Sequence, residues 1–234
     1  MRQSLSGGRH AALPVIAVTG LAIEARIAAG AGVRALAGGG VAAQLAAALE
    51  REIARGACAV ISFGIAGGLA PDVAPGAWIV ARSVITATES WPCDPEWTRI
   101  LAQRLPGAWM SDVAGVDEPV FDASRKRALN LDSGAAALDT ESHVAARIAA
   151  AHGLPFAVFR VIADPAHRSL PAAAAGSLKA DGTVSSGAVL RSLARTPGQL
   201  PLLLRTAVDA RAAFRALSRG RRLLGPRLGY PDLA

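Results

Sequence analysis

The chain has 234 residues, of which 52% are hydrophobic and 18% are charged, so it can bury a sizeable core and is not an extended disordered chain. Its formal net charge of +7 lies entirely in residues 191–234, where nine Arg face two Asp; this argues against a general nucleic-acid binder and predicts a neutral body with a basic tail. Two cysteines exclude a disulfide framework or a zinc finger, and the longest uncharged stretch, residues 56–71, is too short for a transmembrane helix.

The first half of the chain is predicted to alternate strands and helices. Three β-branched residues in four at 15–18, followed closely by Gly20, favour a buried first strand over the alternative of a signal peptide, so we expect a cytoplasmic protein. Residues 57–63 are a continuous apolar run, typical of a strand buried on both faces, which is expected to end in a glycine-rich loop at 64–68. The other elements expected here are a helix at 22–29, a strand at 33–37, an Ala-rich helix from 38 to about 55, and a strand at 77–81 that continues toward 86.

The second half of the chain continues this alternation. Asp94 as N-cap and Pro95 at the first helical position predict a helix at 94–105. The expected elements after it are a weaker helix at 123–130, a helix capped by Asp139 or Thr140 that Gly153 stops after His152, a buried strand at 156–163, a turn at 181–182, and helices at 185–195 and 199–219. This order predicts an α/β fold of three α/β/α layers around a mostly parallel or mixed sheet, as a single domain over residues 1–234.

Carboxylates occur near the ends of the predicted strands, where open α/β sheets bind ligands. Glu24 comes shortly after the first strand, Asp164 directly follows the strand at 156–163, and Glu141 lies at the start of a helix. Each has a structural explanation as well: Asp164 forms a turn before Pro165, Glu141 complements a helix dipole, and the glycine-rich loop is a tight turn. Their expected co-location at one edge of the sheet favours a functional site.

Other catalytic chemistries have little support in the sequence. No G-x-S-x-G elbow is present, and Cys93 lacks an obvious paired base, which makes it a packing or loop cysteine. The four histidines, His10, His143, His152 and His167, show no metal-ligand spacing, so we expect no metal site. We also expect no organic cofactor.

Two stretches together resemble the signatures of the nucleoside phosphorylase superfamily, which includes the MTA/SAH (methylthioadenosine and S-adenosylhomocysteine) nucleosidases. The first is ISFGIAGGL at 61–69 followed by PGAWIV at 75–80, similar to the family's G-S-A-G-G-like loop and its next strand. The second, within 138–164, comprises LDTES, LPF and RVIAD, similar to the family's Met-Glu pair, P-F and R-x-I-S-D. The resemblance covers roughly residues 14–190, and implies the family's fold and a homo-oligomer with subunits paired near their active sites.

Within this superfamily the chain looks closest to the hopanoid-associated branch, the adenosylhopane nucleosidases or phosphorylases. The supporting segments are TGLAIEAR at 19–26, SFGIAGG at 62–68, AGVD at 114–117, ESH at 141–143 and RTPGQLP at 195–201. The resemblance implies cleavage of the N-glycosidic bond of an adenine nucleoside, adenosylhopane, in hopanoid biosynthesis, releasing adenine by attack of phosphate or water at C1′. The alternatives are an MTA/SAH nucleosidase and a catalytically silent nucleoside-binding protein on the same fold.

The resemblance also assigns roles to individual residues. It implies that Asp164 protonates the purine near N7, that Glu141 grips the ribose 2′ and 3′ hydroxyls, and that Glu24 lies beside the attacking water. Burial can raise the pKa of such an acid enough for it to hold a proton at neutral pH. Phosphate or water is expected beside Gly20 and Gly40. The residues expected to bind substrate are Gly64, Ile65, Ala66, Gly67, Val120, Asp139 and Thr140.

Four departures from the family pattern bear on the substrate. Ile65 and Ala163 each replace a Ser, and Thr140 replaces the Met that packs on the ribose. The stretch 24–40 is much shorter than in the nucleosidases. Loss of the Ser at position 65 weakens a phosphate site, and the short stretch predicts a less covered pocket that suits a nucleoside with a bulky apolar 5′ substituent.

The basic tail, about 199–234, is expected to be helical. An apolar set at helical spacing predicts a final helix that packs on the body with a solvated Arg face. We also consider that this face rests on anionic lipid at the inner membrane and brings the pocket to a membrane-resident substrate. The apolar set is Leu203, Ala207, Ala210, Phe214 and Leu217, and the Arg set is Arg205, Arg211, Arg215, Arg219, Arg221 and Arg222.

Overall fold

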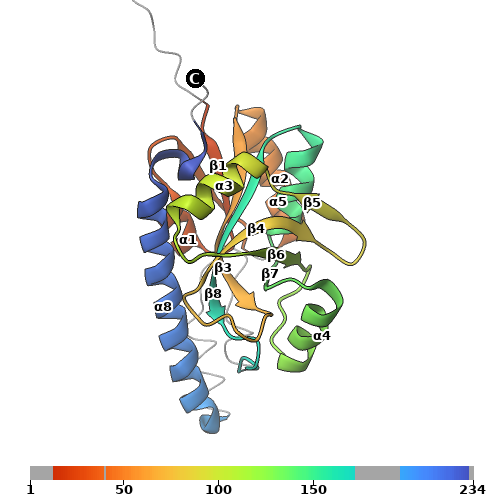
Figure 1. Cartoon of the computed structure of the whole chain (residues 1–234), viewed down its shortest axis with the longest axis vertical. Coiled ribbons are helices and arrows are strands. Elements are labelled where there is room, and N and C mark those ends of the chain that lie inside the picture. The colour runs from red at the N-terminus through yellow and green to blue at the C-terminus, as the bar shows by residue number, and fades with distance from the viewer. Residues whose placement is uncertain (1–12, 40, 172–195, 232–234) are drawn as a thin grey trace, which may run out of the picture.

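Strands and helices alternate along the chain in the computed structural model, which describes residues 13–39, 41–171 and 196–231 (Figure 1). The strands are β1 (Val15–Thr19), β2 (Val33–Ala37), β3 (Ala59–Gly68), β4 (Trp78–Ile85), β5 (Ser90–Pro92), β6 (Trp109–Gly115), β7 (Ala137–Asp139) and β8 (Phe156–Asp164). The helices are α1 (Ala22–Ala28), α2 (Ala42–Ala54), α3 (Pro95–Arg104), α4 (Ala123–Ser133), α5 (Ser142–Ala151) and α8 (Leu200–Leu224), with single 3₁₀ turns at Pro197–Gln199 and Pro226–Gly229.

The described strands form one mixed sheet whose pairing closes on itself. Its order is β2-β1-β3-β7-β6-β4-β5, and β8 pairs in parallel with β3 and antiparallel with β4. Strands β3, β8, β4, β6 and β7 therefore make a ring, while β1 and β2 extend the sheet from β3. Register shifts in β3 and β4 mark where those strands bend to reach new partners.

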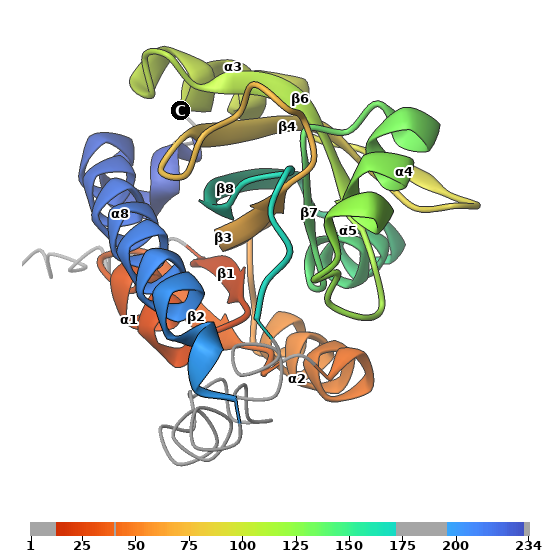
Figure 2. The same ribbon diagram turned by 90° about the horizontal axis from the view of Figure 1, so that it is seen from below.

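Two-residue alternation along the strands divides the core into two layers. In β1, Ile16 and Val18 pack with one cluster, whereas Val15 and Ala17 pack with the other. Helices α2 and α5 cover the first face, and α1, α3 and α8 cover the second, so the strands lie between them (Figure 2). The predicted three-layer α/β/α fold with a mixed sheet is confirmed.

The glycine-rich segment at 64–68 is not the loop that the sequence predicted. It is the second half of β3, which stays paired with β8 as far as Gly67, with a register shift after Ala66, and pairs with β7 at Gly67 and Gly68. Strands β5, β6 and β7 were also not predicted, because two of them have only three residues and β6 mixes exposed and buried positions without clean alternation.

The helices follow their local signals more closely. The Asp94 carboxylate accepts a hydrogen bond from the Trp97 N–H, as expected of the N-cap of α3. The N-cap of α5 is Glu141 rather than Asp139 or Thr140, although the Asp139 side chain accepts hydrogen bonds from the first free N–H groups of this helix. The turn at 181–182 and the helix at 185–195 lie outside the described residues.

Helix α8 is longer than expected. Phe214 and Leu217 of the predicted apolar set pack on the body, but the buried face also takes in residues outside that set. Its buried positions are Ala213, Leu217, Gly220 and Leu224, whereas Ala207 is exposed. Gly220 is the point of closest approach, because a Cβ there would lie 2.5 Å from the Phe159 ring on β8. Among the described residues, no helix is both long and apolar enough to cross a membrane.

Candidate active site

The ends of β1, β3 and β8 meet the starts of α1 and α5 around a cavity of about 200 Å³. Carboxyl-terminal strand ends converge there because β1, β3 and β8 run parallel. Its described lining residues are Gly20, Leu21, Glu24, Ile65, Ala66, Gly67, Pro119, Val120, Phe121, Leu138, Asp139, Thr140, Glu141, Ala163, Asp164 and Leu170.

The structure brings almost all the predicted site residues to this cavity. The three proposed catalytic carboxylates, Glu24, Glu141 and Asp164, lie in its wall together with the predicted substrate-binding residues other than Gly64. Gly64 lies behind the wall, beside Glu24 and a buried arginine. Gly40 lies outside the described residues, so its predicted contact with phosphate or water stays a prediction.

Glu24 is held by two backbone N–H groups from different elements. Its Oε1 accepts a hydrogen bond from Ile65 N–H on β3 at 2.7 Å, and its Oε2 accepts one from Leu21 N–H at 2.7 Å. Burial raises the pKa of Glu24 to about 7, even though nearby Arg160 and these two hydrogen bonds lower it. A carboxyl group with this pKa is suited to act as a general base near neutral pH.

Arg160 is a fully buried cation that organises the carboxylates around it. It extends from β8, and its Nε forms an ion pair with Asp139 Oδ2 at 2.9 Å while its Nη2 donates to Glu141 Oε2 at 3.3 Å. Arg160 also donates to Ser62 Oγ at 2.6 Å and to the Ile65 carbonyl at 3.2 Å. Although burial lowers the pKa of Arg160, the neighbouring carboxylates raise it overall.

Asp139, predicted to bind substrate, is instead engaged within the protein. Its Oδ1 accepts from the N–H groups of Glu141 and Ser142, and its Oδ2 accepts from the Ser142 hydroxyl and pairs with Arg160. Although Asp139 reaches the cavity wall, each of its oxygens already has two partners, whereas each Glu24 oxygen accepts one hydrogen bond, so the geometry of Asp139 suits positioning of Arg160 and Glu141.

Charge balance leaves this part of the cavity acidic. Glu24, Asp139 and Glu141 share one cation, Arg160, and burial raises the pKa of Glu141, as does the Asp139 charge, against the lowering effect of Arg160. A low-dielectric site with excess carboxylate stabilises a positive charge that develops beside it. The arrangement therefore suits a reaction in which the bound molecule becomes cationic here.

Asp164 lies further toward the C-terminal end of β3 than Glu24. Strand pairing places it opposite Gly67, two residues beyond Ile65, and two residues of strand span roughly 7 Å. Its carboxylate forms an ion pair with Lys126 of α4, whose side chain is fully buried. Burial raises the pKa of Asp164 above its ordinary value, although Lys126 and Arg168 lower it.

Glycines allow two of these carboxyl groups to approach the strands. A Cβ at Gly20 would lie 2.9 Å from Glu141 Oε1, and one at Gly64 would lie 2.7 Å from Glu24 Oε1. These distances are shorter than real side-chain contacts, so glycine at each position leaves space for a carboxylate.

Two central residues, Arg160 and Lys126, were not predicted as site residues. Arg160 could have been found as a lone cation in an otherwise apolar buried strand, because a buried charge requires partners. Lys126 is one of two lysines in a chain with 23 arginines, and that rarity is the available signal.

A model of the phosphorylase superfamily matches residues 12–194, well over half of the chain. The chain belongs to the phosphorylase superfamily. The sequence-based assignment to this superfamily is therefore confirmed, and the chain is an enzyme of the nucleoside phosphorylase or nucleosidase type. A search of curated proteins finds no match.

Solved structures share this superfamily fold at low sequence identity. Futalosine hydrolase of Helicobacter pylori matches with 14% identity and a TM-score of 0.61, covering 79% of this chain and 99% of its own. S-adenosylhomocysteine nucleosidase of Streptococcus pyogenes, in complex with 5-methylthiotubericidin, matches with 16% identity and a TM-score of 0.58 over 86% of this chain and 98% of its own. The H. pylori 5′-methylthioadenosine/S-adenosylhomocysteine nucleosidase with butyl-thio-DADMe-Immucillin-A matches with 14% identity and a TM-score of 0.60. The match covers 89% of this chain and 98% of the nucleosidase chain.

Proposed function

We propose that this enzyme hydrolyses the N-glycosidic bond of an adenine nucleoside and releases adenine. Asp164 protonates the leaving purine, Glu141 accepts hydrogen bonds from the ribose hydroxyls, and Glu24 deprotonates the attacking water. The observation that carries this proposal is one cavity with four carboxyl groups in its wall, those of Glu24, Asp139, Glu141 and Asp164, and, among its described lining residues, no Lys, Arg or His.

The proposed reaction matches this distribution of charge. Cleavage of the C1′–N bond leaves positive charge on the sugar and negative charge on the base. The excess carboxylate around Arg160 stabilises the sugar cation, and a proton from Asp164 neutralises the base. Water then adds to C1′ while Glu24 takes its proton, and the enzyme is regenerated when Glu24 releases that proton and Asp164 regains one.

The same cavity favours water over phosphate as the nucleophile. Phosphate sites rely on cations or on free N–H groups. Arg160 is engaged by carboxylates and carbonyl oxygen, and the Ile65 N–H already donates to Glu24. A phosphate dianion beside Glu24 and Glu141 would also be repelled.

An adenine-release assay tests this proposal directly. The purified protein is incubated with adenosine, 5′-methylthioadenosine and S-adenosylhomocysteine, with and without phosphate. We expect adenine and a free sugar at a rate that does not depend on phosphate. Ribose 1-phosphate formed only with phosphate would make the enzyme a phosphorylase, and no adenine from any nucleoside would indicate a silent nucleoside-binding protein.

We further propose that the substrate carries a bulky apolar 5′ substituent, with adenosylhopane as the candidate. The support is an apolar part of the cavity wall, formed by Leu21, Val120, Phe121 and Leu170, and the short stretch 24–40. One structural neighbour contains a ligand with a butyl-thio group, which illustrates an apolar extension in this fold. We expect kcat/KM to rise along a series of 5′-alkylthioadenosines of increasing chain length, and highest activity on 5′-methylthioadenosine would favour the MTA/SAH nucleosidase alternative.

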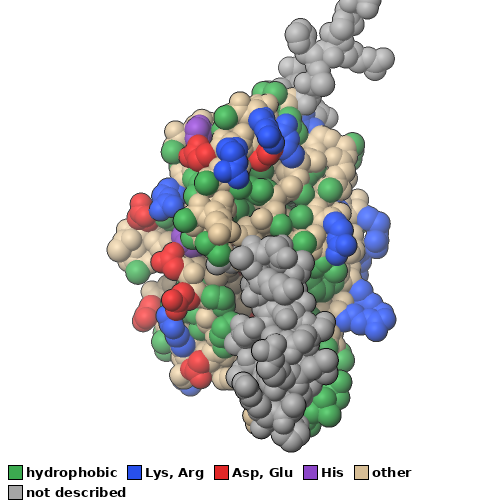
Figure 3. Space-filling model, turned by 180° about the vertical axis from the view of Figure 1, so that it is seen from behind, with side chains coloured by type: hydrophobic (Ala, Val, Ile, Leu, Met, Phe, Trp, Pro, Cys, Tyr) green, Lys and Arg blue, Asp and Glu red, His purple; other side chains and the backbone are tan. Residues whose placement is uncertain are grey.

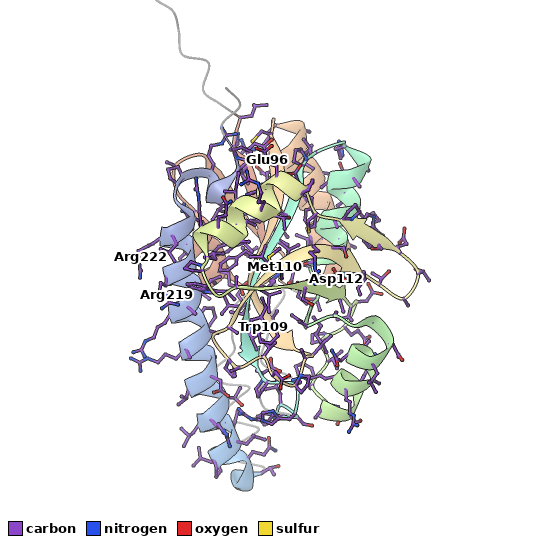
Figure 4. The ribbon with its side chains drawn as sticks, viewed as in Figure 1. Glu96, Trp109, Met110, Asp112, Arg219 and Arg222 are labelled. Carbon is purple, nitrogen blue, oxygen red and sulfur yellow. The ribbon has the colours of Figure 1, made fainter. Side chains whose placement is uncertain are left out.

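Helix α8 provides a surface that suits an anionic membrane holding such a substrate. Leu204 and Val208 are 59% and 67% exposed. Arg211, Arg215 and Arg222 follow on the same face, where they line a groove of about 810 Å³ against α1. Arg side chains lie next to apolar ones along the right-hand edge of the view in Figure 3, and Arg219 and Arg222 lie on α8 in Figure 4.

Two arginines of the predicted lipid-binding set have other partners. Arg221 is half-buried and donates to the Ala28 and Gly225 carbonyls, so it is not part of a free Arg face. Arg219 lies over the Trp78 ring, 4.3 Å from its centroid. Each remaining exposed Arg contributes about 1 kcal/mol near an anionic surface, screened by salt.

Sedimentation with vesicles of increasing anionic lipid content tests this contact. We expect binding at low salt that is lost when Arg211, Arg215 and Arg222 are changed to Gln. The matched control changes three exposed arginines on other helices, Arg51, Arg99 and Arg127, to Gln. Wild-type protein that stays in the supernatant, or equal loss in both triple variants, contradicts a specific lipid-binding face.

A homo-oligomer stays a proposal for this chain. A second large groove, of about 1160 Å³, runs past β5 and α4 and combines apolar residues such as Trp91 and Val116 with charged ones such as Arg147. Because Val116 lies just before the cavity-lining segment that begins at Pro119, a subunit docked here would contact one wall of the active site. Analytical ultracentrifugation is expected to give more than one subunit per particle, and a monomer at all concentrations would refute it.

A further inference from the structure

Lys126 is the most completely buried cation near the proton donor. Its side chain is 0% exposed, and its Nζ donates to Asp164 Oδ2, to the Pro165 carbonyl at 3.3 Å and to the Arg168 carbonyl at 3.1 Å. These acceptors match the three N–H groups of an ammonium. All three belong to the segment that carries Asp164, so one side chain of α4 holds that segment.

The use of lysine here is exceptional for this chain. The sequence has 23 arginines and two lysines, and an ammonium is a compact charge where a guanidinium is a planar fork. Three oxygen acceptors around one buried nitrogen match the three N–H donors of an ammonium group better than a planar guanidinium. The geometry of this site therefore suits a lysine better than an arginine.

The ion pair also distinguishes the two oxygens of Asp164. Lys126 binds Oδ2, whereas Oδ1 lies on the side of Gly67, where a Cβ would be 3.6 Å away. Gly67 and Asp164 both line the cavity. Because an ammonium can only donate, Oδ2 must act as an acceptor, and a proton on this carboxyl group resides on Oδ1, toward the cavity.

We propose that Lys126 is a positioning residue that fixes Oδ2 of Asp164 as the acceptor, so that the acidic proton lies on Oδ1 facing the bound purine. This inference rests on the proposed function of Asp164 as proton donor. It assigns Lys126 no direct contact with substrate.

The charges around Asp164 give this proposal a signature in pH dependence. Lys126 of α4 and Arg168 of its own segment lower the pKa of Asp164, while Asp209 of α8, which pairs with Arg168, raises it. Activity requires protonated Asp164 and declines as pH rises through its pKa. Removal of the Lys126 charge raises this pKa further, so the alkaline limb of the rate profile moves to higher pH.

The test compares Lys126→Met with Arg127→Met, an exposed neighbour on the same helix. We expect Lys126→Met to lower kcat for adenine release roughly 10- to 100-fold and to move the alkaline limb up by about one pH unit. A nitrophenyl riboside, whose leaving group departs without protonation, should be cleaved at nearly the wild-type rate by the same variant. Arg127→Met should leave all three quantities unchanged.

Several outcomes overturn the proposal. An equal loss on both substrates, or an alkaline limb that does not move, indicates a purely structural lysine. If Lys126→Met fails to fold, Lys126→Arg is used instead, because it keeps the charge. For Lys126→Arg we expect slower adenine release, unchanged cleavage of the nitrophenyl riboside and an alkaline limb at the wild-type pH. Equal slowing on both substrates would then refute the proposal. Failure of the proposed function is distinct, because wild-type protein would release no adenine.

Discussion

The two ends of the cavity hold their carboxyl groups in different ways. At the arginine end, Glu24, Asp139 and Glu141 surround Arg160; at the lysine end, Asp164 forms an ion pair with Lys126, and nearby Arg168 also lowers its pKa. Both cations are fully buried. Three carboxyl groups surround Arg160, whereas one carboxyl group pairs with Lys126. Surplus negative charge favours a cation in the bound molecule, whereas a balanced pair fixes the orientation of one acid.

This difference explains how one carboxyl group, that of Glu24, serves as a base while another, that of Asp164, serves as an acid. Glu24 lies among other carboxyl groups and accepts two N–H bonds, which suits a base that cycles near pH 7. Asp164 has one oxygen bound by an ammonium and the other toward the cavity, which suits delivery of a proton in one direction. Variants that alter one end at a time should therefore produce different kinetic signatures.

The largest effect is expected at the lysine end. Asp164→Asn keeps the shape of the side chain but cannot deliver a proton, so adenine release should fall roughly 10²- to 10⁴-fold. Cleavage of a nitrophenyl riboside should fall far less, because that leaving group needs no proton. Steady-state kinetics on both substrates measure this, and an unchanged rate of adenine release in a folded variant removes Asp164 from the mechanism.

At the arginine end, Glu24→Gln should slow hydrolysis on the order of 10²-fold. The pKa of Glu24 is raised to about 7, and a base must be ionised, so the wild-type rate should decline as pH falls below about 7. This acidic limb should vanish in Glu24→Gln. Rate profiles between pH 5 and pH 9 test the expectation, and a limb retained in the variant assigns it to another group.

A smaller, substrate-dependent loss is expected for Glu141→Gln. The amide keeps one acceptor oxygen but removes the charge that faces the sugar, so ribosides should bind more weakly and react roughly 10-fold more slowly. A 2′-deoxyriboside should be less sensitive, because part of the contact is already missing. Equal losses on both substrates would favour a role for Glu141 at the start of α5 alone.

The smallest effects concern two glycines, one at each end. Gly20→Ala places a Cβ 2.9 Å from Glu141 Oε1 and must displace that carboxylate, so a loss of no more than about 10-fold is expected. At Gly67 a Cβ would meet Leu138 and Asp164 at 3.5–3.6 Å, which is ordinary contact, so Gly67→Ala should change the rate less. A greater loss in Gly67→Ala would mean that the purine occupies that space.

The sequence predicted the positions of the acids better than their partners. The three acids lie next to helices and strands that the local sequence predicts clearly, such as the apolar run that forms β8. These acids are Glu24, Glu141 and Asp164. Arg160 was hidden within that run, and its partners come from β3, β7 and α5. Lys126 contacts a segment 38 residues away.

The missed strands have the same physical origin. Three-residue β7 exists because β3 and β6 flank it, and its own residues do not specify a strand. The glycines at 64–68 locally favour a turn, but pairing on both sides keeps them extended. Closure of the ring from β3 to β7 depends on such distant pairs, which local patterns do not encode.

Hydrolysis in heavy-oxygen water tests the central claim most directly. Wild-type enzyme is incubated with an adenine nucleoside in this water without phosphate, and the mass of the released sugar is measured by mass spectrometry. The account predicts stoichiometric adenine and a sugar that carries one solvent oxygen at C1′, at a rate that added phosphate does not raise. Adenine released only when phosphate is present, with ribose 1-phosphate as the product, would contradict it.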